Sequence, residues 1–221
     1  TTTLHRQPAT VVTDREGIPL RIFLPPDEQL RIPVTLSEVA PVFLQTLIAS
    51  EDRWFYFHPG VNPFALVRAA WVNLHHGRIV SGASTISMQI ARLAEPKPRT
   101  LWAKGQEIFR ALQLERHFTK NQLLEFYVNL TPYGGNVEGI GAASTVYFAK
   151  TPAQLSLGEA ALLAVLPRSP NGYNPTRDPQ AALTVRNRVL KQLTVQHIFS
   201  PVAIADALEL VNADRLDEYA A

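Results

Sequence analysis

Two adjacent carboxylates, Glu51 and Asp52, open an aromatic-rich stretch with the sequence EDRWFYFHPG. If this stretch forms a continuous helix, Glu51 shares one face of it with three residues that carry rings, namely Trp54, Phe55 and His58. Rings that shield a carboxylate from water raise its pKa, so that it can exchange a proton near neutrality. Glu51 is therefore a candidate general base or acid, although aromatic residues also anchor ordinary helix ends.

A second stretch, SGASTISMQIAR, gathers short polar side chains where a helix is expected to begin. Ser84, Thr85 and Gln89 offer hydrogen-bond donors there, and Arg92 follows Gln89 by about one helical turn. A helix N-terminus lined with hydroxyl groups binds anions readily. The same residues are also compatible with ordinary N-capping by Ser84.

A third candidate group consists of Lys104 and Glu107, three residues apart on an expected helix, with Arg99 close in sequence. An exposed ion pair of this kind commonly contributes less than about 1 kcal/mol and has no further role. Residues 78–120, however, hold eight Lys and Arg against three Glu, in a chain whose net charge is only +2. This local excess of positive charge favours an anionic ligand such as a pyrophosphate.

These three groups fit two kinds of chemistry. One is glycosyl transfer from a phosphate-activated donor, and the other is hydrolysis of a glycan by a pair of carboxylates. The spacing of the residues alone does not separate the two.

The elements that must position these groups are mostly helices. Apolar residues recur at helical spacing after an N-cap at Ser37, with Pro41 in the first turn and an end near Pro59. A second helix is expected between a cap at Asn62 and a terminating Gly77. Further helices are expected over residues 84–94, 98–118, 119–132 (capped by Thr119) and 156–168, with one more after a Gly-rich turn and two at the C-terminus. Residues 10–36, rich in Val, Ile, Thr and Pro, predict a β-hairpin or extended arm.

The composition is that of a folded globular protein, with 46% hydrophobic and 18% charged residues. The net charge gives no sign of a nucleic-acid partner. The absence of cysteine excludes a disulfide framework, a thiol nucleophile and Cys-ligated zinc. No stretch approaches the roughly 18 to 20 apolar residues of a membrane span, and no signal peptide is recognisable, so we expect a soluble protein or an excised domain.

Five stretches, in order, resemble the motifs of glycosyltransferase family 51. EDRWFYFHPG is similar to E-D-x-x-F-x-x-H-x-G, GASTISMQ to G-G-S-T-I-T-Q-Q, and KGQE to R-K-x-x-E. EFYVNLTPYGGNVEGIGAASTVYFAK resembles the segment that ends in Y-F-x-K, and EAALLAVLPRSPNGYNP resembles E-A-A-x-L-A-x-L-P-x-x-P. The resemblance covers residues 37–180 and is strongest to the 1C branch of the class A penicillin-binding proteins.

The resemblance implies a peptidoglycan glycosyltransferase that polymerises lipid II into β-1,4 glycan strands, inverting the configuration at the donor sugar. It implies a mainly α, lysozyme-like, two-lobed fold with a small membrane-facing jaw and the N-terminal arm. The chain is then expected to consist of an N-terminal arm (residues 1–36), a glycosyltransferase core (37–180) that includes the jaw (62–80), and C-terminal helices of the same domain (181–221).

By motif, the resemblance makes Glu51 the general base and Glu107 a second catalytic residue, which organises the departing pyrophosphate directly or through Mg²⁺ or Mn²⁺. Asp52 and Glu107 are the candidate ligands of that cation, and no organic cofactor is expected. The remaining substrate-binding residues by motif are Asp52, His58, Ser84, Thr85, Gln89, Arg92, Arg99, Lys104, Asn129 and Gly134.

This sequence departs from the family pattern at three places. Ala103 stands where the third motif has arginine, Ala83 where the second has glycine, and Ser87 with Met88 where the second has T-Q. The loss of a guanidinium at position 103 would weaken pyrophosphate binding, for which Arg99 could partly compensate.

The resemblance also implies partners and a location. The jaw would contact the membrane through Phe64, Leu66 and Trp71, at the outer, periplasmic face of the bacterial inner membrane, beside other cell-wall synthesis proteins. We therefore expect this chain to be the glycosyltransferase domain alone, without the membrane anchor and the transpeptidase domain of longer relatives. Two alternatives remain: a lysozyme-like hydrolase or lytic transglycosylase, and a non-catalytic module that binds lipid II or glycan.

Overall fold

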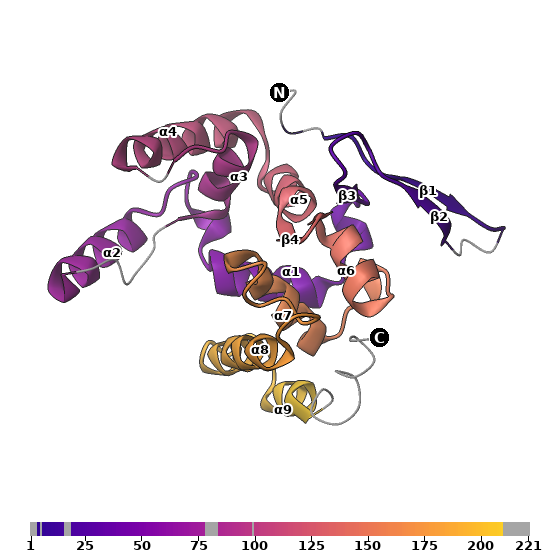
Figure 1. The fold of residues 1–221 in the computed structure, drawn as a ribbon. Helices are drawn as coiled ribbons and strands as arrows, with labels where there is room; N and C mark the ends of the chain where they lie inside the picture. Colours follow the sequence, from indigo (N-terminus) through magenta and orange to yellow (C-terminus); the bar gives the residue numbers. More distant parts are fainter. Residues whose placement is uncertain (1–3, 5, 16–18, 78–83, 99, 210–221) are drawn as a thin grey trace. The chain divides into compact units, whose positions relative to one another are not determined.

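The computed structural model describes residues 4, 6–15, 19–77, 84–98 and 100–209 (Figure 1). The chain divides into two compact units, unit 1 with Thr1–Ser50 and Val128–Ala221, and unit 2 with Glu51–Tyr127. Helices dominate both units, which confirms the mainly α fold. Within the described ranges, no helix combines the length and the apolar character that crossing a membrane requires.

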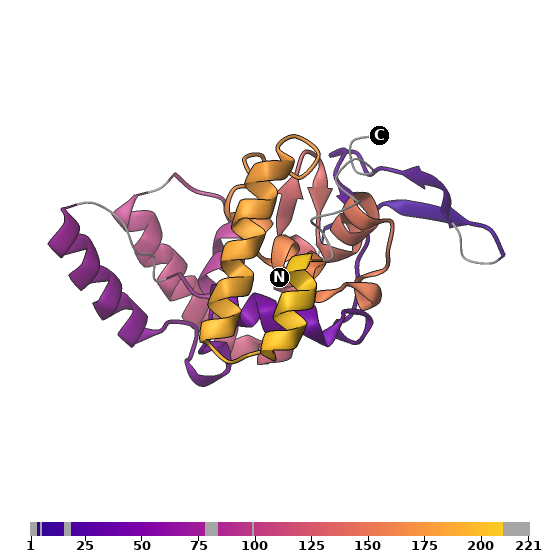
Figure 2. The same ribbon diagram turned by 90° about the horizontal axis from the view of Figure 1, so that it is seen from below.

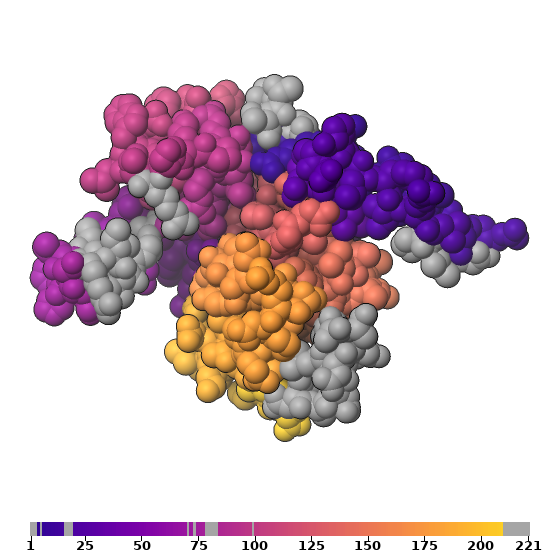
Figure 3. Space-filling model, viewed as in Figure 1, coloured from indigo at the N-terminus to yellow at the C-terminus, as the bar shows by residue number. Residues whose placement is uncertain are grey.

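The N-terminal hairpin of unit 1 is present as predicted. Strands β1 (Thr10–Thr13) and β2 (Pro19–Phe23) pair antiparallel, with Thr10 opposite Phe23. Pro19 begins β2, a position at which the missing N–H group is tolerated in a two-stranded ribbon. In the space-filling view the hairpin forms a narrow arm (Figure 3).

A small mixed sheet in unit 1 was not predicted. Strand β5 (Val137–Glu138) lies between β3 (Leu30–Arg31), to which it is parallel, and β4 (Pro132–Gly134), to which it is antiparallel. Arg31 Nε lies 3.0 Å from Glu138 Oε1, and both side chains are buried. Part of the predicted N-terminal arm is therefore built into this sheet.

The helical core of unit 1 lies around α7 (Leu157–Val165), whose alanines allow neighbouring helices to approach closely. Helix α7 packs against α8 (Pro179–Val195) and α9 (Pro201–Glu209), which lie side by side in Figures 1 and 2. Helix α6 (Ile140–Phe148) contacts α7 and the sheet. The buried cluster consists of Ala49, Ala161, Val165, Val185, Val189, Leu190, Leu193, Ile204 and Ala207.

Unit 2 contains α2 (Pro63–His76), α3 (Ile86–Ala94), α4 (Leu101–His117) and most of α5 (Lys120–Leu130). The predicted ends of α2 are confirmed, because Asn62 Oδ1 accepts the Ala65 N–H and Gly77 adopts a left-handed conformation. Thr119 precedes α5 and accepts the Gln122 N–H, also as predicted. Helices α3 and α4 pack closely together.

The first predicted helix is wrong at both ends. Residues Leu36–Glu38 form a separate 3₁₀ turn capped by Thr35, so Ser37 is not an N-cap. Helix α1 (Pro41–Glu51) begins at Pro41, where proline needs no N–H partner. It ends at Glu51 rather than near Pro59, and Phe55–Phe57 form another 3₁₀ turn.

Candidate active site

Glu51 is the last residue of α1 and is half-buried. Its Oε2 accepts a hydrogen bond from Gln89 Nε2 on α3 at 3.0 Å. The orientation of that amide is set in turn by the Tyr127 hydroxyl, which donates to Gln89 Oε1 at 3.4 Å. The first predicted group, which contains Glu51, therefore contacts the second, which contains Gln89.

The predicted ring-lined helix face around Glu51 is wrong. Because α1 ends at Glu51, Trp54 and Phe55 do not continue its surface. Trp54 is 55% exposed, whereas Phe55 is fully buried and packs edge-on against Tyr56 and His58. Of these two rings, only that of Phe55 anchors the segment that follows α1.

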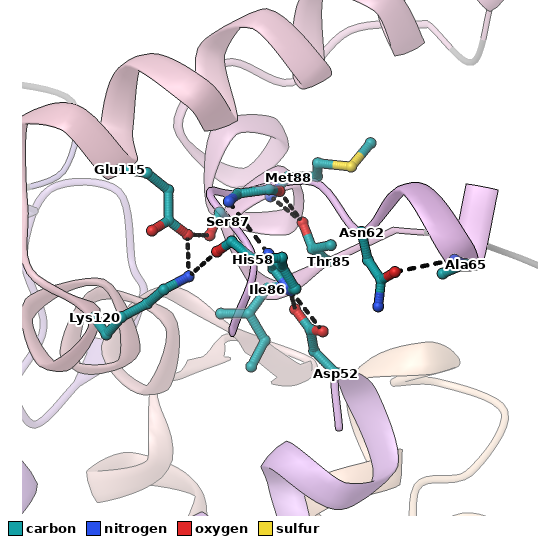
Figure 4. A network of polar contacts seen from close by, with 11 residues as sticks. Asp52, His58, Asn62, Ala65, Thr85, Ile86, Ser87, Met88, Glu115 and Lys120 are labelled. Atoms are coloured by element: carbon teal, nitrogen blue, oxygen red, sulfur yellow. Dashed lines mark hydrogen bonds and ion pairs between the residues drawn. The ribbon is translucent and has the colours of Figure 1, made fainter. Parts of the chain in front are cut away.

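Asp52 is a buried anchor of that segment rather than an open carboxylate (Figure 4). Its two oxygens lie 2.9 and 3.0 Å from His58 Nε2, and Oδ2 also accepts the Ile86 N–H at the start of α3, at 3.0 Å. His58 Nδ1 accepts the Gly60 N–H at 3.2 Å, so the ring proton sits on Nε2 and is donated to Asp52. His58 is thus a structural link, and its predicted contact with substrate finds no support in this arrangement.

The start of α3 is capped by Thr85, whose Oγ1 accepts the Met88 N–H at 3.2 Å and donates to Gly60 O. Ser84, the residue that the sequence offered as an alternative explanation by N-capping, is therefore not the cap. Instead, Ser84 Oγ accepts a hydrogen bond from Lys104 Nζ on α4 at 2.7 Å. This contact joins the hydroxyl-rich stretch to the basic group.

Lys104 and Glu107 form the predicted ion pair on α4, with Nζ 2.9 Å from Oε2. Glu107 also neutralises part of the local charge, while Lys104 keeps a hydroxyl partner in Ser84. Ala103, which stands at the position of the missing arginine, is buried on the same helix. Ser84, Lys104 and Glu107 therefore form one polar group that joins the second and third motifs.

Further basic residues surround the connection between α3 and α4. Arg92 lies in the last turn of α3, and Lys97 and Arg110 both contact Glu95. The hydrogen bond from Lys97 and the nearby charge of Arg110 hold the pKa of Glu95 below its usual range. Arg99 lies outside the described residues. The described basic residues of this region thus lie on α3, on α4, in the connection between them and at the start of α5.

The remaining predicted residues, Asn129 and Gly134, belong to unit 1 and have structural contacts there. The Asn129 amide accepts the Val34 N–H at 2.9 Å and donates to Val34 O at 2.8 Å. Gly134 has a φ of +111°, and a Cβ there would lie 2.7 Å from Pro170 O. Both residues maintain the backbone of unit 1, and these contacts lend no support to a direct role in substrate binding.

The candidate cation ligands fit a metal poorly. Both oxygens of Asp52 are occupied by His58, and one by the N–H of Ile86 as well. Across the described residues, no group of three or more His, Cys, Asp or Glu side chains is arranged to hold a metal ion. Glu107, paired with Lys104, is the less constrained of the two proposed ligands.

Two residues that sequence reasoning missed lie beside this site. Glu115, near the end of α4, accepts hydrogen bonds from Ser87 and from Lys120, at the start of α5. Tyr127, which orients Gln89, is also buried. The sequence offers one signal for the Glu115–Lys120 pair. The two residues stand on either side of Thr119, where one helix was predicted to end and the next to begin, so that an ion pair between them would join two helices.

Comparisons with known proteins bear on the family of this chain. A family model described as transglycosylase matches residues 17–194. The chain is 48% identical over 207 residues to penicillin-binding protein 1C of Escherichia coli K12, covering 93% of this chain and 27% of that protein. It is 41% identical over 181 residues to penicillin-binding protein 1A of Aquifex aeolicus, covering 81% of this chain and 25% of that protein. The chain thus spans about a quarter of the length of these curated relatives.

A crystal structure of penicillin-binding protein 1A from Haemophilus influenzae has the same fold, with a TM-score of 0.53 and 21% identity. The match covers 93% of this chain and 21% of that one. The family model spans most of the chain and includes every predicted site residue. The chain therefore belongs to the transglycosylase family.

Proposed function

We propose that this chain is a peptidoglycan glycosyltransferase that polymerises lipid II into β-1,4 glycan strands, with Glu51 as the general base. The observation that carries the proposal is the convergence of three motifs within unit 2. Gln89 of the second motif donates to Glu51 of the first, and Ser84 of the second accepts from Lys104 of the third. The carboxylate is thereby held by α3, and the cationic group by the residue just before the N-cap of α3.

In this proposal the reaction is a single displacement. The Glu51 carboxylate takes the proton of the acceptor 4-hydroxyl as its oxygen bonds to the anomeric carbon of the donor. The bond from that carbon to the pyrophosphate oxygen breaks, and the electron pair leaves with the polyprenyl pyrophosphate. Inversion follows because the nucleophile enters opposite to the leaving group, and no covalent enzyme intermediate forms.

The charge that develops on the leaving pyrophosphate would be stabilised by the cations of α3, α4 and their connection. Lys104 would be the central donor, since Glu107 and Ser84 fix its ammonium group at 2.9 and 2.7 Å. Arg92 and Arg99 would contribute further positive charge. Where Mg²⁺ or Mn²⁺ accompanies the pyrophosphate, Glu107 is the residue that would meet it.

Helix α2 would form the membrane contact of this enzyme. Its exposed apolar side chains include Phe64, Val67, Trp71 and Leu74, with exposed fractions of 71 to 85%. Arg68 and a C-terminal His75–His76 pair lie on the same helix, a composition that suits a membrane surface with anionic lipids. Leu66 is half-buried and would contribute less than predicted. The site would then face lipid II at the periplasmic side of the inner membrane, beside other cell-wall enzymes.

The test is incubation of the chain with labelled lipid II in detergent, with the products separated by length on a gel. The wild type should produce a ladder of strands, and Glu51→Gln should lose it, because the amide keeps the shape but cannot take the proton. The rate should fall by at least about 10²-fold, the lower end of what a general base contributes. Glu28→Gln, at an exposed glutamate of unit 1, should leave the ladder unchanged.

Two other outcomes would contradict the proposal. Shortening of a preformed glycan, with no growth from lipid II, would identify a hydrolase that uses Glu51 as an acid. Binding of lipid II with neither growth nor cleavage would identify a non-catalytic binding module.

A further inference from the structure

A half-buried ion pair at the turn between α4 and α5 lies outside all of the motifs discussed above. Lys120 Nζ lies 2.7 Å from Glu115 Oε1, and the two side chains are 21 and 8% exposed. Lys120 also donates to the backbone oxygen of His58 at 2.6 Å, and its ammonium lies 4.5 Å from the centre of the Phe55 ring. One cation therefore holds the segment that follows Glu51 against two helices.

Glu115 extends this contact to α3. Its Oε1 accepts the hydroxyl proton of Ser87, in the first turn of α3, in addition to the Lys120 hydrogen bond (Figure 4). Gly60 allows the approach, since its φ is +95° and a Cβ there would lie 2.9 Å from Glu115 Cγ and from Ala111 O. The pair thus joins the segment after α1, the start of α3 and the turn between α4 and α5.

The two elements joined in this way are those that carry the Glu51–Gln89 hydrogen bond. Glu51 immediately precedes the segment that contains Phe55 and His58, and Gln89 follows Ser87 by two residues on α3. We infer that the Lys120–Glu115 pair is a positioning device for the general base, which holds Glu51 and Gln89 in register without contacting substrate. This inference rests on the proposed function, in which Glu51 is the base.

The structure offers a matched control in unit 1. Lys150 Nζ lies 2.7 Å from Glu159 Oε1, and these side chains are 30 and 8% exposed, close to the values of the Lys120–Glu115 pair. The Lys150–Glu159 pair joins the end of α6 to the first turn of α7. Lys150→Met should therefore lower stability to a similar extent as Lys120→Met without moving the Glu51–Gln89 pair.

The experiment measures kcat and KM for lipid II with the full chain, at a temperature where circular dichroism shows each variant to be folded. A misplacement of about 1 Å typically costs about 10²-fold in rate. Lys120→Met should lower kcat by about 10- to 100-fold with less than about a threefold change in KM, since no substrate contact is lost. Lys120→Arg should recover much of that loss, because a guanidinium can still reach Glu115 and the His58 oxygen. Lys150→Met should keep the wild-type kcat.

Equal kcat values for Lys120→Met and Lys150→Met would overturn the inference, since the pair would then contribute stability alone. A second measurement, hydrogen exchange of the amides at residues 52–60 and 85–89, decides the point independently of activity. Lys120→Met should accelerate exchange there, whereas Lys150→Met should not; unchanged exchange in Lys120→Met would also overturn the inference. A wild type that makes no glycan would contradict the proposed function instead, and the exchange rates would still decide whether the pair holds the two segments.

Discussion

Replacement of Asp52 by asparagine tests the polar network behind the site, because it removes a charge while nearly keeping the shape. The carboxylate accepts the proton of His58 Nε2 and the Ile86 N–H, and all of these groups are buried. An asparagine has one accepting oxygen and one donating NH₂ group in place of the two oxygens. The asparagine oxygen could stand at the Oδ2 position, 3.0 Å from both partners, but the NH₂ group would then replace Oδ1, which lies 2.9 Å from His58 Nε2.

No rearrangement of the network satisfies all of its donors. When the amide oxygen faces Ile86, the NH₂ group opposes the His58 Nε2 proton. Moving that proton to Nδ1 would bring it against the Gly60 N–H, which Nδ1 accepts in the wild type. When the amide oxygen faces His58, the NH₂ group opposes the first N–H of α3. One buried N–H is left without an acceptor in every case.

The cost can be estimated from these contacts. Loss of hydrogen bonds to a charged group costs about 1.5 to 3 kcal/mol, and a buried unsatisfied donor costs about 1 to 3 kcal/mol. Asp52→Asn should therefore lower the free energy of unfolding by about 3 to 5 kcal/mol. Asp178→Asn is the matched control, since Asp178 accepts the Ala181 N–H at the exposed start of α8, where asparagine caps equally well.

Urea unfolding followed by circular dichroism measures these differences, and a double-mutant cycle tests their origin. In a His58→Ala background, Asp52→Asn no longer opposes a ring proton and should cost only about 1 to 2 kcal/mol. A cost below about 1 kcal/mol in the wild-type background would refute the hydrogen-bond assignment. Equal costs in the two backgrounds would refute the part of the argument that concerns the histidine tautomer.

Two further predictions concern unit 2. Gly60→Ala should lower the free energy of unfolding by more than about 2 kcal/mol, because strain at positive φ adds to contact with Ala111 O at 2.9 Å. Gly77→Ala, at a φ of +60° with nothing within 4 Å, should cost only about 1 kcal/mol in the same urea experiment; equal costs would contradict the packing argument. Phe64→Ser with Trp71→Ser should weaken sedimentation with phosphatidylglycerol vesicles at least about tenfold and leave the unfolding midpoint unchanged, since both side chains are highly exposed. Unchanged vesicle binding would contradict a membrane contact through α2.

The features predicted well from the sequence are those that neighbouring residues decide. Asn62 and Gly77 bound α2 as expected, because a side-chain cap and a left-handed glycine act within one turn of the helix end. The N-terminal hairpin also follows from the local enrichment in Val, Ile and Thr. The five motifs predicted the family, and their order along the chain needs no tertiary information.

The failures occur where a distant residue decides the local structure. The apolar run through Phe57 predicted a longer first helix, but the chain turns after Glu51 so that Asp52 meets the start of α3, 34 residues away. Ser84 is an equally good N-cap by type, yet Lys104 binds it and leaves the cap to Thr85. The strands around β5 are two or three residues long, and β3 pairs with β5 across more than a hundred positions, which no periodicity signals.

Glu51 and Asp52 are adjacent carboxylates of similar chemistry, and their tertiary contacts give them different roles. Asp52 directs its oxygens into the protein, where they hold His58 and the first N–H of α3. Glu51 accepts from Gln89, which lies one turn further along the same helix. Asp52 therefore fixes the helix that presents the partner of Glu51, and a change at Asp52 should disturb stability and catalysis together. A change at Glu51, a half-buried residue at a helix end, should act on catalysis with a smaller effect on stability. Measuring both quantities for each variant separates a base from the residue that positions its partner.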